Sequence, residues 1–260
     1  MFLGIGLRLG MLGSVSFSPA ALFASGEEGA WFDPSDLSTL FQDSAGTTPV
    51  TTAGQPVGLM LDKSGMGNNA TQATSSQRPT YQTGAGLHWL AFDGVDDAMA
   101  TGSIAFTATD EMSIFAGVRT ISTTTSMLVE SSSNPGANDG AFHIARLGSN
   151  SWQALNRGTA NQTISGSAVA APASTVVVSS AKISTPSISI RENGSEIASN
   201  TSTQGSGNYG NYALYFGARN TSSLFFHGNM YGLIARGKTT DAAQIALTET
   251  YLATKSGVTL

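Results

Sequence analysis

From Trp31 onward the sequence alternates between short apolar or β-branched runs and turn residues, which limits the folds open to the chain. Gly, Asn, Asp and Pro separate the runs, as they separate strands in all-β proteins. The runs fall at residues 86–92, 112–121, 127–130, 141–147, 175–183, 187–192, 213–219 and 225–235. Because amphipathic helices need longer stretches with apolar residues three or four apart, these runs predict β-strands.

The clearest turn signal is the pair Asn193-Gly194, which separates the runs 187–192 and 195–198. Both central residues of a type I′ turn have a positive φ, which Asn and Gly adopt most readily. In the first run, Ile188 and Ile190 alternate with polar residues, as on a half-buried strand. These features predict a β-hairpin.

One segment, residues 241–256, has helical spacing of its apolar side chains. Asp241 can cap its N-terminus, Lys255 lies in the last turn, and Gly257 can take the left-handed position that ends a helix. Many strands followed by a single helix do not make a βαβ pattern, so the sheets should be antiparallel. No repeat of fixed period suggests a propeller or solenoid, which leaves a sandwich or a barrel.

Composition narrows the function classes. Only 11% of the 260 residues are charged and the net charge is -5, with no basic run that could neutralise a row of phosphates, so we expect no nucleic-acid partner. The chain has no cysteine, which excludes disulfides and thiolate metal sites. No apolar stretch is long enough for a membrane span.

Residues 1–26 are apolar and rich in glycine, and Arg8 interrupts them. A signal peptide would place its positive charge before the apolar stretch, which disfavours but does not remove that alternative. We expect residues 1–26 to form an arm for attachment or oligomerisation, ahead of one domain at residues 27–260. The apolar residues that would make the contacts are Phe2, Leu3, Ile5, Leu7, Leu9, Phe17, Leu22 and Phe23.

Residues 85–101, AGLHWLAFDGVDDAMAT, contain an apolar run, an F-D-G-x-D-D string and a second run. This unit resembles one found in laminin-G-like and concanavalin A-like lectin domains. The later hairpin, the run 225–235 and the closing helix follow in the order typical of that superfamily. The resemblance covers residues 31–257 and implies an all-β, antiparallel jelly-roll β-sandwich with one C-terminal helix.

Residues 17–65 include the string WFDPSDLSTLFQD at 31–43. This segment resembles the N-terminal part of tailed-phage virion proteins. The resemblance implies a structural protein on the virion surface, as a capsid decoration, head fibre or tail component, assembled in the bacterial host cytoplasm. Its partners would be capsid or tail proteins and sister subunits in a homo-oligomer. The alternative is a tail-fibre module that recognises host cell-surface polysaccharide.

The sequence lacks a catalytic set. Glucanases of this fold carry a Glu-x-Asp-x-x-Glu strand, which is missing here, and adjacent acidic residues point to opposite faces of a strand. His88, His143 and His227 lie in separate runs, where each is expected to be a single polar position on a strand face rather than part of a triad or zinc site. We therefore expect a non-enzymatic protein, and a glycan depolymerase is the third hypothesis.

Asp93, Asp96 and Asp97 are the candidate metal ligands, because clustered carboxylates can bind Ca²⁺. Many laminin-G-like domains bind Ca²⁺, and the resemblance extends that expectation to this turn. Asp-Gly between two strands also serves a tight turn in which the side chain bonds its own backbone. Both interpretations stay open, and no other cofactor is expected.

Sugar binding would use exposed aromatic side chains beside polar groups. Trp152, Tyr209 and Tyr212 lie in or beside segments rich in Gly, Ser and Asn, where loops are expected. They are the candidate contacts for weak glycan adhesion, which many copies on one particle would strengthen. Packing at the edge of the sandwich is the alternative for Trp152.

Overall fold

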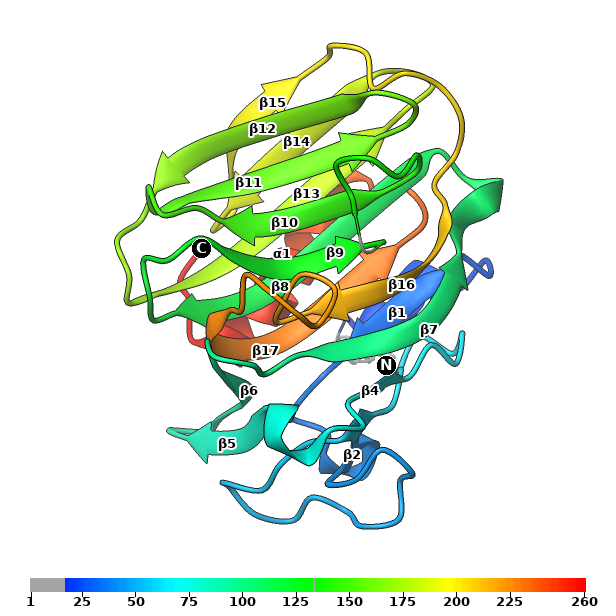
Figure 1. Cartoon of the computed structure of the whole chain (residues 1–260). Coiled ribbons are helices and arrows are strands. Elements are labelled where there is room, and N and C mark those ends of the chain that lie inside the picture. The colour runs from blue at the N-terminus through cyan, green and yellow to red at the C-terminus, as the bar shows by residue number, and fades with distance from the viewer. Residues whose placement is uncertain (1–16, 133) are drawn as a thin grey trace, which may run out of the picture.

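The computed structural model describes residues 17–132 and 134–260, which form two antiparallel β-sheets and one α-helix (Figure 1). The eight-stranded sheet, here called sheet A, has the order β15-β14-β13-β8-β17-β6-β5, with β1 also paired to β17. Its strands are β1 (Gly29–Phe32), β5 (Thr80–Gly84), β6 (Leu87–Asp93), β8 (Glu111–Thr120), β13 (Ala173–Lys182), β14 (Ser187–Glu192), β15 (Ser195–Asn200) and β17 (His227–Arg236).

The nine-stranded sheet, sheet B, has the order β12-β11-β10-β9-β16-β7-β4-β3-β2. Its strands are β2 (Leu40–Phe41), β3 (Leu59–Met60), β4 (Ala70–Thr71), β7 (Met99–Ala105), β9 (Ser126–Ser131), β10 (Phe142–Arg146), β11 (Ser151–Arg157), β12 (Asn161–Ala168) and β16 (Asn211–Phe216). Short 3-10 helices lie at Pro19–Phe23, Leu37–Thr39, Ser75–Gln77 and Phe106–Ala108. The expected antiparallel jelly-roll sandwich is confirmed.

The main core fills the space between the two sheets. Ile114 and Val118 of β8 point into it from sheet A, and Phe142 and Ile144 of β10 point into it from sheet B. Side chains two apart on a strand share a face, so the residues between them face outward. Each sheet therefore also has an outer face, which lies away from the main core.

Helix α1 (Ala242–Ser256) covers the outer face of sheet A, where it lies behind the strands in Figure 1. Phe115 of β8 and Val176 of β13 pack there against Leu252 in a second hydrophobic cluster. The helix begins and ends as expected: the Gln244 N–H donates to the Asp241 carboxylate at 2.8 Å, and Gly257 has a φ of 67°. β8 and β13 are therefore buried on both faces over most of their length.

The second cluster also contains Leu22 and Phe23, which are 0% and 4% exposed. They belong to the 3-10 helix Pro19–Phe23, which contacts β1 and β17. The expectation that these two residues make attachment contacts is wrong, because burial under the sheet leaves them no surface for a partner. Phe17 is half-buried at the edge of the same cluster, and Phe2, Leu3, Ile5, Leu7 and Leu9 lie outside the described residues.

The Asn193-Gly194 hairpin is confirmed. Asn193 has a φ of 47° and Gly194 a φ of 81°, the positive values of a type I′ turn, and β14 pairs with β15 across it. Within the two described ranges, no helix is long and apolar enough to cross a membrane.

Candidate functional site

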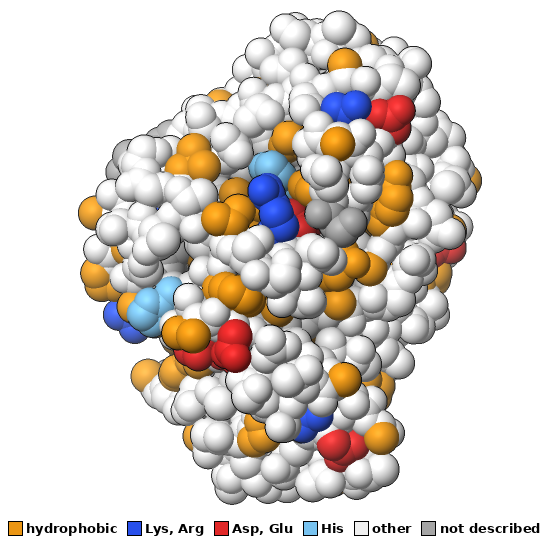
Figure 2. Space-filling model, in the orientation of Figure 1, with side chains coloured by type: hydrophobic (Ala, Val, Ile, Leu, Met, Phe, Trp, Pro, Cys, Tyr) orange, Lys and Arg blue, Asp and Glu red, His pale blue; other side chains and the backbone are white. Residues whose placement is uncertain are grey.

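A row of side chains crosses the outer face of sheet B from strand to strand. Tyr215 of β16 pairs with Glu130 of β9, Glu130 with His143 of β10, His143 with Leu155 of β11, and Leu155 with Thr163 of β12. Directly paired residues of antiparallel strands point to the same face. Figure 2 shows a histidine, a basic and an acidic side chain adjoining in the middle of this face, next to hydrophobic side chains.

Glu130 is the buried carboxyl of this row, with 0% of its side chain exposed. Its Oε1 accepts the Asn220 N–H at 2.8 Å, and its Oε2 lies 3.4 Å from Nε of Arg219. Burial raises the pKa of Glu130 to about 7, although the Arg219 charge and these hydrogen bonds oppose the rise. Near neutral pH the carboxyl is therefore divided between its charged and neutral forms.

His143 lies beside Glu130 and is 5% exposed. Its Nε2 lies 3.2 Å from Oε1 of Gln153, and with the amide in this orientation Nε2 is the donor. The other ring nitrogen, Nδ1, is a buried acceptor without a hydrogen-bond partner among the described residues. Burial lowers the pKa of His143 to about 4, so the ring is neutral at physiological pH.

Arg219 begins the loop 219–224, which leads from β16 towards β17. The loop closes on itself, because the Arg219 N–H donates to Ser223 O at 2.7 Å. Asn220, Thr221 and Leu224 have φ values of 47°, 53° and 50°, in the left-handed region that β-branched and bulky residues rarely adopt. Such strain persists where the surrounding structure imposes it, and it clusters at functional sites.

A second loop, residues 134–140, leads to β10 (Figure 1). The Tyr212 hydroxyl donates to Asp139 O at 2.9 Å, and Arg157 contacts the Asp139 carboxylate at 3.0 Å and Gly136 O at 3.2 Å. Tyr212 is thus half-buried and anchors this loop. Its ring is not a free platform for a sugar.

Trp152 and Tyr209, the other expected sugar contacts, are 0% and 1% exposed. Trp152 lies on β11 and faces the core between the sheets, while the Tyr209 hydroxyl donates to Asn156 at 2.7 Å inside that core. Trp152 lies on a strand inside sheet B and not in a loop, whereas Tyr209 lies in the loop before β16 as expected, but both side chains are buried. The aromatic side chain on the outer face is Tyr215, three positions beyond Tyr212.

The residues predicted from the sequence did not include Glu130, Arg219 or Tyr215. His143 was expected to be a single polar residue on a strand face. One signal was present: in the run 141–147, His143 alternates with Phe142 and Ile144 and so had to face away from the core. The pairing of β9, β10 and β16 could not be read from the chain. That pairing is what makes a site of these residues.

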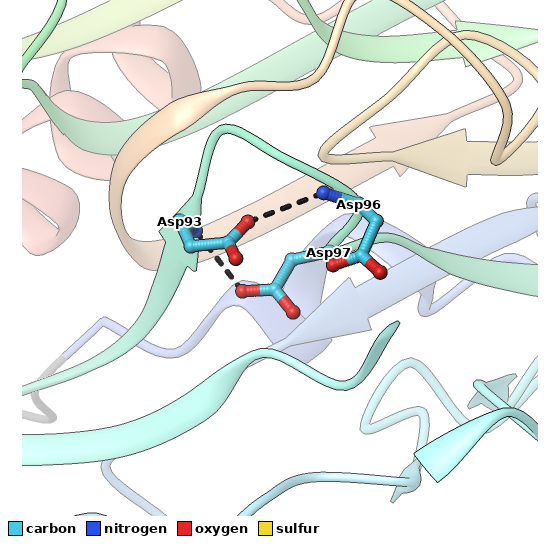
Figure 3. A group of neighbouring side chains, drawn as sticks. All are labelled: Asp93, Asp96 and Asp97. Carbon is cyan, nitrogen blue, oxygen red and sulfur yellow. Dashed lines mark hydrogen bonds between the residues drawn. The ribbon is translucent and has the colours of Figure 1, made fainter. Parts of the chain in front are cut away.

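Asp93, Asp96 and Asp97 do come together. Their carboxylate oxygens lie within 4.8 Å of one another on the turn between β6 and β7 (Figure 3). Asp93 Oδ1 accepts the Val95 and Asp96 N–H groups at 2.8 and 3.3 Å, and Asp97 Oδ2 accepts the Asp93 N–H at 3.0 Å. The turn thus uses the aspartates for its own backbone, as one of the two sequence interpretations required.

The same turn has the charge to hold a cation. Burial raises the pKa of Asp97 to about 6, and the negative charges of Asp93 and Asp96 add to the rise. A divalent cation would relieve this repulsion, and the three carboxylates would supply part of the about six to eight oxygens that Ca²⁺ takes. These residues therefore fit Ca²⁺, with carbonyls and water completing the shell.

The chemistry of the sheet B face suits binding. Its groups are an accessible guanidinium, a neutral imidazole acceptor and a half-buried phenol ring. Glycoside hydrolysis needs two carboxyl groups across the bond that breaks. Among the described residues, Glu130 makes its polar contacts with Arg219 and Asn220 and not with a second carboxyl group.

No protein-family model matches the sequence, and no curated protein does either. Solved structures share the fold at low identity. Botulinum neurotoxin type C, whose cell entry depends on two ganglioside molecules, matches with a TM-score of 0.60 and 12% identity over 90% of this chain and 53% of its own.

The binding domain of botulinum neurotoxin DC in complex with SialylT matches with a TM-score of 0.56 and 14% identity, over 74% of this chain and 48% of its own. Trypanosoma rangeli sialidase with the inhibitor DANA matches with a TM-score of 0.54 and 14% identity, over 79% of this chain and 34% of its own. This chain therefore spans about half or less of the length of these three structures. At these identities the likeness identifies the lectin-like sandwich fold.

Proposed function

We propose that this chain is a non-catalytic carbohydrate-binding domain that holds a glycan on the outer face of sheet B, against Tyr215, His143 and Arg219. The observation that carries the proposal is the buried Nδ1 of His143, which has no hydrogen-bond partner among the described residues. The His143 side chain is 5% exposed and lies beside the accessible Arg219. A buried acceptor without a partner carries a desolvation cost that a hydrogen-bond donor on a ligand would recover. A sugar hydroxyl would donate to it.

The two other groups complete a sugar-binding set. Arg219 supplies hydrogen-bond donors, and Tyr215 supplies an aromatic surface against which the apolar face of a sugar ring packs. Nδ1 itself is covered, so a ligand reaches it when the side chains around it shift. The similar folds that take gangliosides and SialylT support this proposal by analogy of architecture.

A glycan array with the full chain, followed by titration calorimetry on the hits, tests the proposal. We expect Tyr215→Ala to weaken binding by about 10-fold, the value of a lost aromatic contact. Trp89→Ala is the matched control, since Trp89 is a half-buried aromatic residue on sheet A. Equal losses in the two variants, or binding to no glycan, would overturn the proposal.

We further propose that the domain is displayed on a phage particle, where weak glycan contacts add up over many copies. The support is the resemblance of residues 17–65 to phage virion proteins. With Leu22 and Phe23 buried, the contacts proposed for attachment reduce to the apolar residues before position 16 and to Phe17. Deleting residues 1–16 should abolish incorporation into particles while circular dichroism stays unchanged; unchanged incorporation would contradict this assignment.

A further inference from the structure

We propose that the glycan bound on this face carries a carboxylate, and that Arg219 is the residue that binds it. The inference rests on the proposed function, because it names the ligand class of the same site. An acidic sugar, with a carboxylate and hydroxyls on one ring, is the chemistry that the exposed groups match.

The two charged groups of the site, Arg219 and Glu130, differ in how accessible they are to a ligand. The Arg219 side chain is 38% exposed, whereas the Glu130 side chain is 0% exposed. Both oxygens of Glu130 face inward partners, Nε of Arg219 and the backbone N–H of Asn220. A ligand approaching the site therefore meets the guanidinium and not the carboxylate.

The geometry of Arg219 also favours a carboxylate. Its hydrogen bond to Glu130 uses Nε. Its two terminal nitrogens make no hydrogen bond with residues 17–132 or 134–260. Two adjacent N–H donors match the two oxygens of a carboxylate in a bidentate pair. The contact with Glu130 holds the guanidinium in place for that pair.

The charge balance around Arg219 favours a carboxylate as well. Because burial raises the pKa of Glu130 to about 7, this carboxyl cancels only part of the arginine charge near neutral pH. His143 is neutral there and adds no charge of its own. The site is therefore left with an uncompensated positive charge in a chain whose net charge is -5.

Pairs of glycans that differ in one group test the inference. Acidic glycans ending in uronic or sialic acids are compared with their carboxyl-reduced forms, in which –COO⁻ becomes –CH₂OH, using the full chain and calorimetry. We expect the acidic form to bind about 10- to 100-fold more tightly, the range of a charge-assisted hydrogen bond.

Arg219→Gln should remove that preference, weakening the acidic form about 10- to 100-fold and the reduced form little. Arg219→Lys keeps the charge without the bidentate fork and should fall between the two. Arg119→Gln is the control, since Arg119 is an exposed arginine on β8 of the other sheet, and it should change nothing.

The outcomes separate the inference from the proposed function. If acidic and reduced forms bind equally well and both depend on Tyr215, the domain binds carbohydrate but the inference is wrong. If the acidic preference survives Arg219→Gln in a protein with unchanged circular dichroism, another residue binds the carboxylate and the inference is again wrong. If no glycan of either kind binds, both fail.

Discussion

The outer faces of the two sheets differ in what covers them. On sheet A, helix α1 and the 3-10 helix Pro19–Phe23 bury Phe115 and Val176 in an apolar cluster. On sheet B, the loop 219–224 contacts Glu130, which lies in a row with His143. The outer face of sheet A gains stability from apolar burial. The outer face of sheet B keeps titratable groups under a strained loop. Such an arrangement costs stability and is typical of binding sites.

The largest effect should come from breaking the covered face. Phe115→Ala removes a side chain that is 0% exposed under α1, and we expect it to lower the free energy of unfolding by about 3–5 kcal/mol. Urea denaturation measures the loss. Leu247→Ala on the exposed side of the same helix, 47% exposed, is the control and should cost less than about 0.5 kcal/mol. Similar costs at the two positions would mean that α1 does not seal this face.

The buried carboxyl on sheet B should make stability depend on pH. The pKa of Glu130 is raised from 4.5 to about 7, so the folded state favours the protonated form, and its contribution is present below pH 4.5 and lost as pH rises to 7. Glu130→Gln cannot ionise. Relative to this variant, the wild type should lose about 2–3 kcal/mol between pH 4.5 and pH 8.

The difference between wild type and variant isolates Glu130, since His143 is present in both proteins. Its lowered pKa acts in the opposite direction, costing stability as pH falls from 6.5 towards 4. Denaturation curves at several pH values supply the measurement. A wild type and variant with parallel pH profiles would contradict the assignment of a raised pKa to Glu130.

The turn at Asp93, Asp96 and Asp97 joins β6 of sheet A to β7 of sheet B, so a cation there would strengthen the link between the two sheets. A few millimolar Ca²⁺ should stabilise the protein by about 1–2 kcal/mol, as expected for a site of sub-millimolar affinity. Differential scanning calorimetry with Ca²⁺ and with EDTA checks this. Asp97→Asn should abolish the response; a response that survives it places any bound ion elsewhere.

The smallest effect should come from the loop that borders the sheet B face. Tyr212→Phe removes the hydrogen bond to Asp139 O and should cost about 0.5–1.5 kcal/mol. Amide exchange in residues 134–140 should rise, while exchange in α1 stays the same. Unchanged exchange in that loop would mean that Tyr212 does not anchor it.

The accuracy of the sequence predictions follows the range of the interactions involved. The Asn193-Gly194 turn, the Asp241 cap and the alternation in Ser187–Glu192 depend on neighbouring residues, and the structure confirms them. Trp152 was misplaced because polar residues flank it in β11, a strand whose inner face is set by its pairing with β10 and β12. Its burial depends on the opposite sheet, which no local pattern records.

By itself, the sequence determined an antiparallel all-β chain with a closing helix, because strand periodicity, turn residues and caps act over a few residues. Only the tertiary structure decided which face helix α1 covers and which face carries the row of polar side chains. Glu130, His143 and Tyr215 lie on three strands brought together by pairing, and Arg219 on a loop held by Glu130. Their pKa values and their accessibility arise from burial, a property of the folded chain and not of any segment.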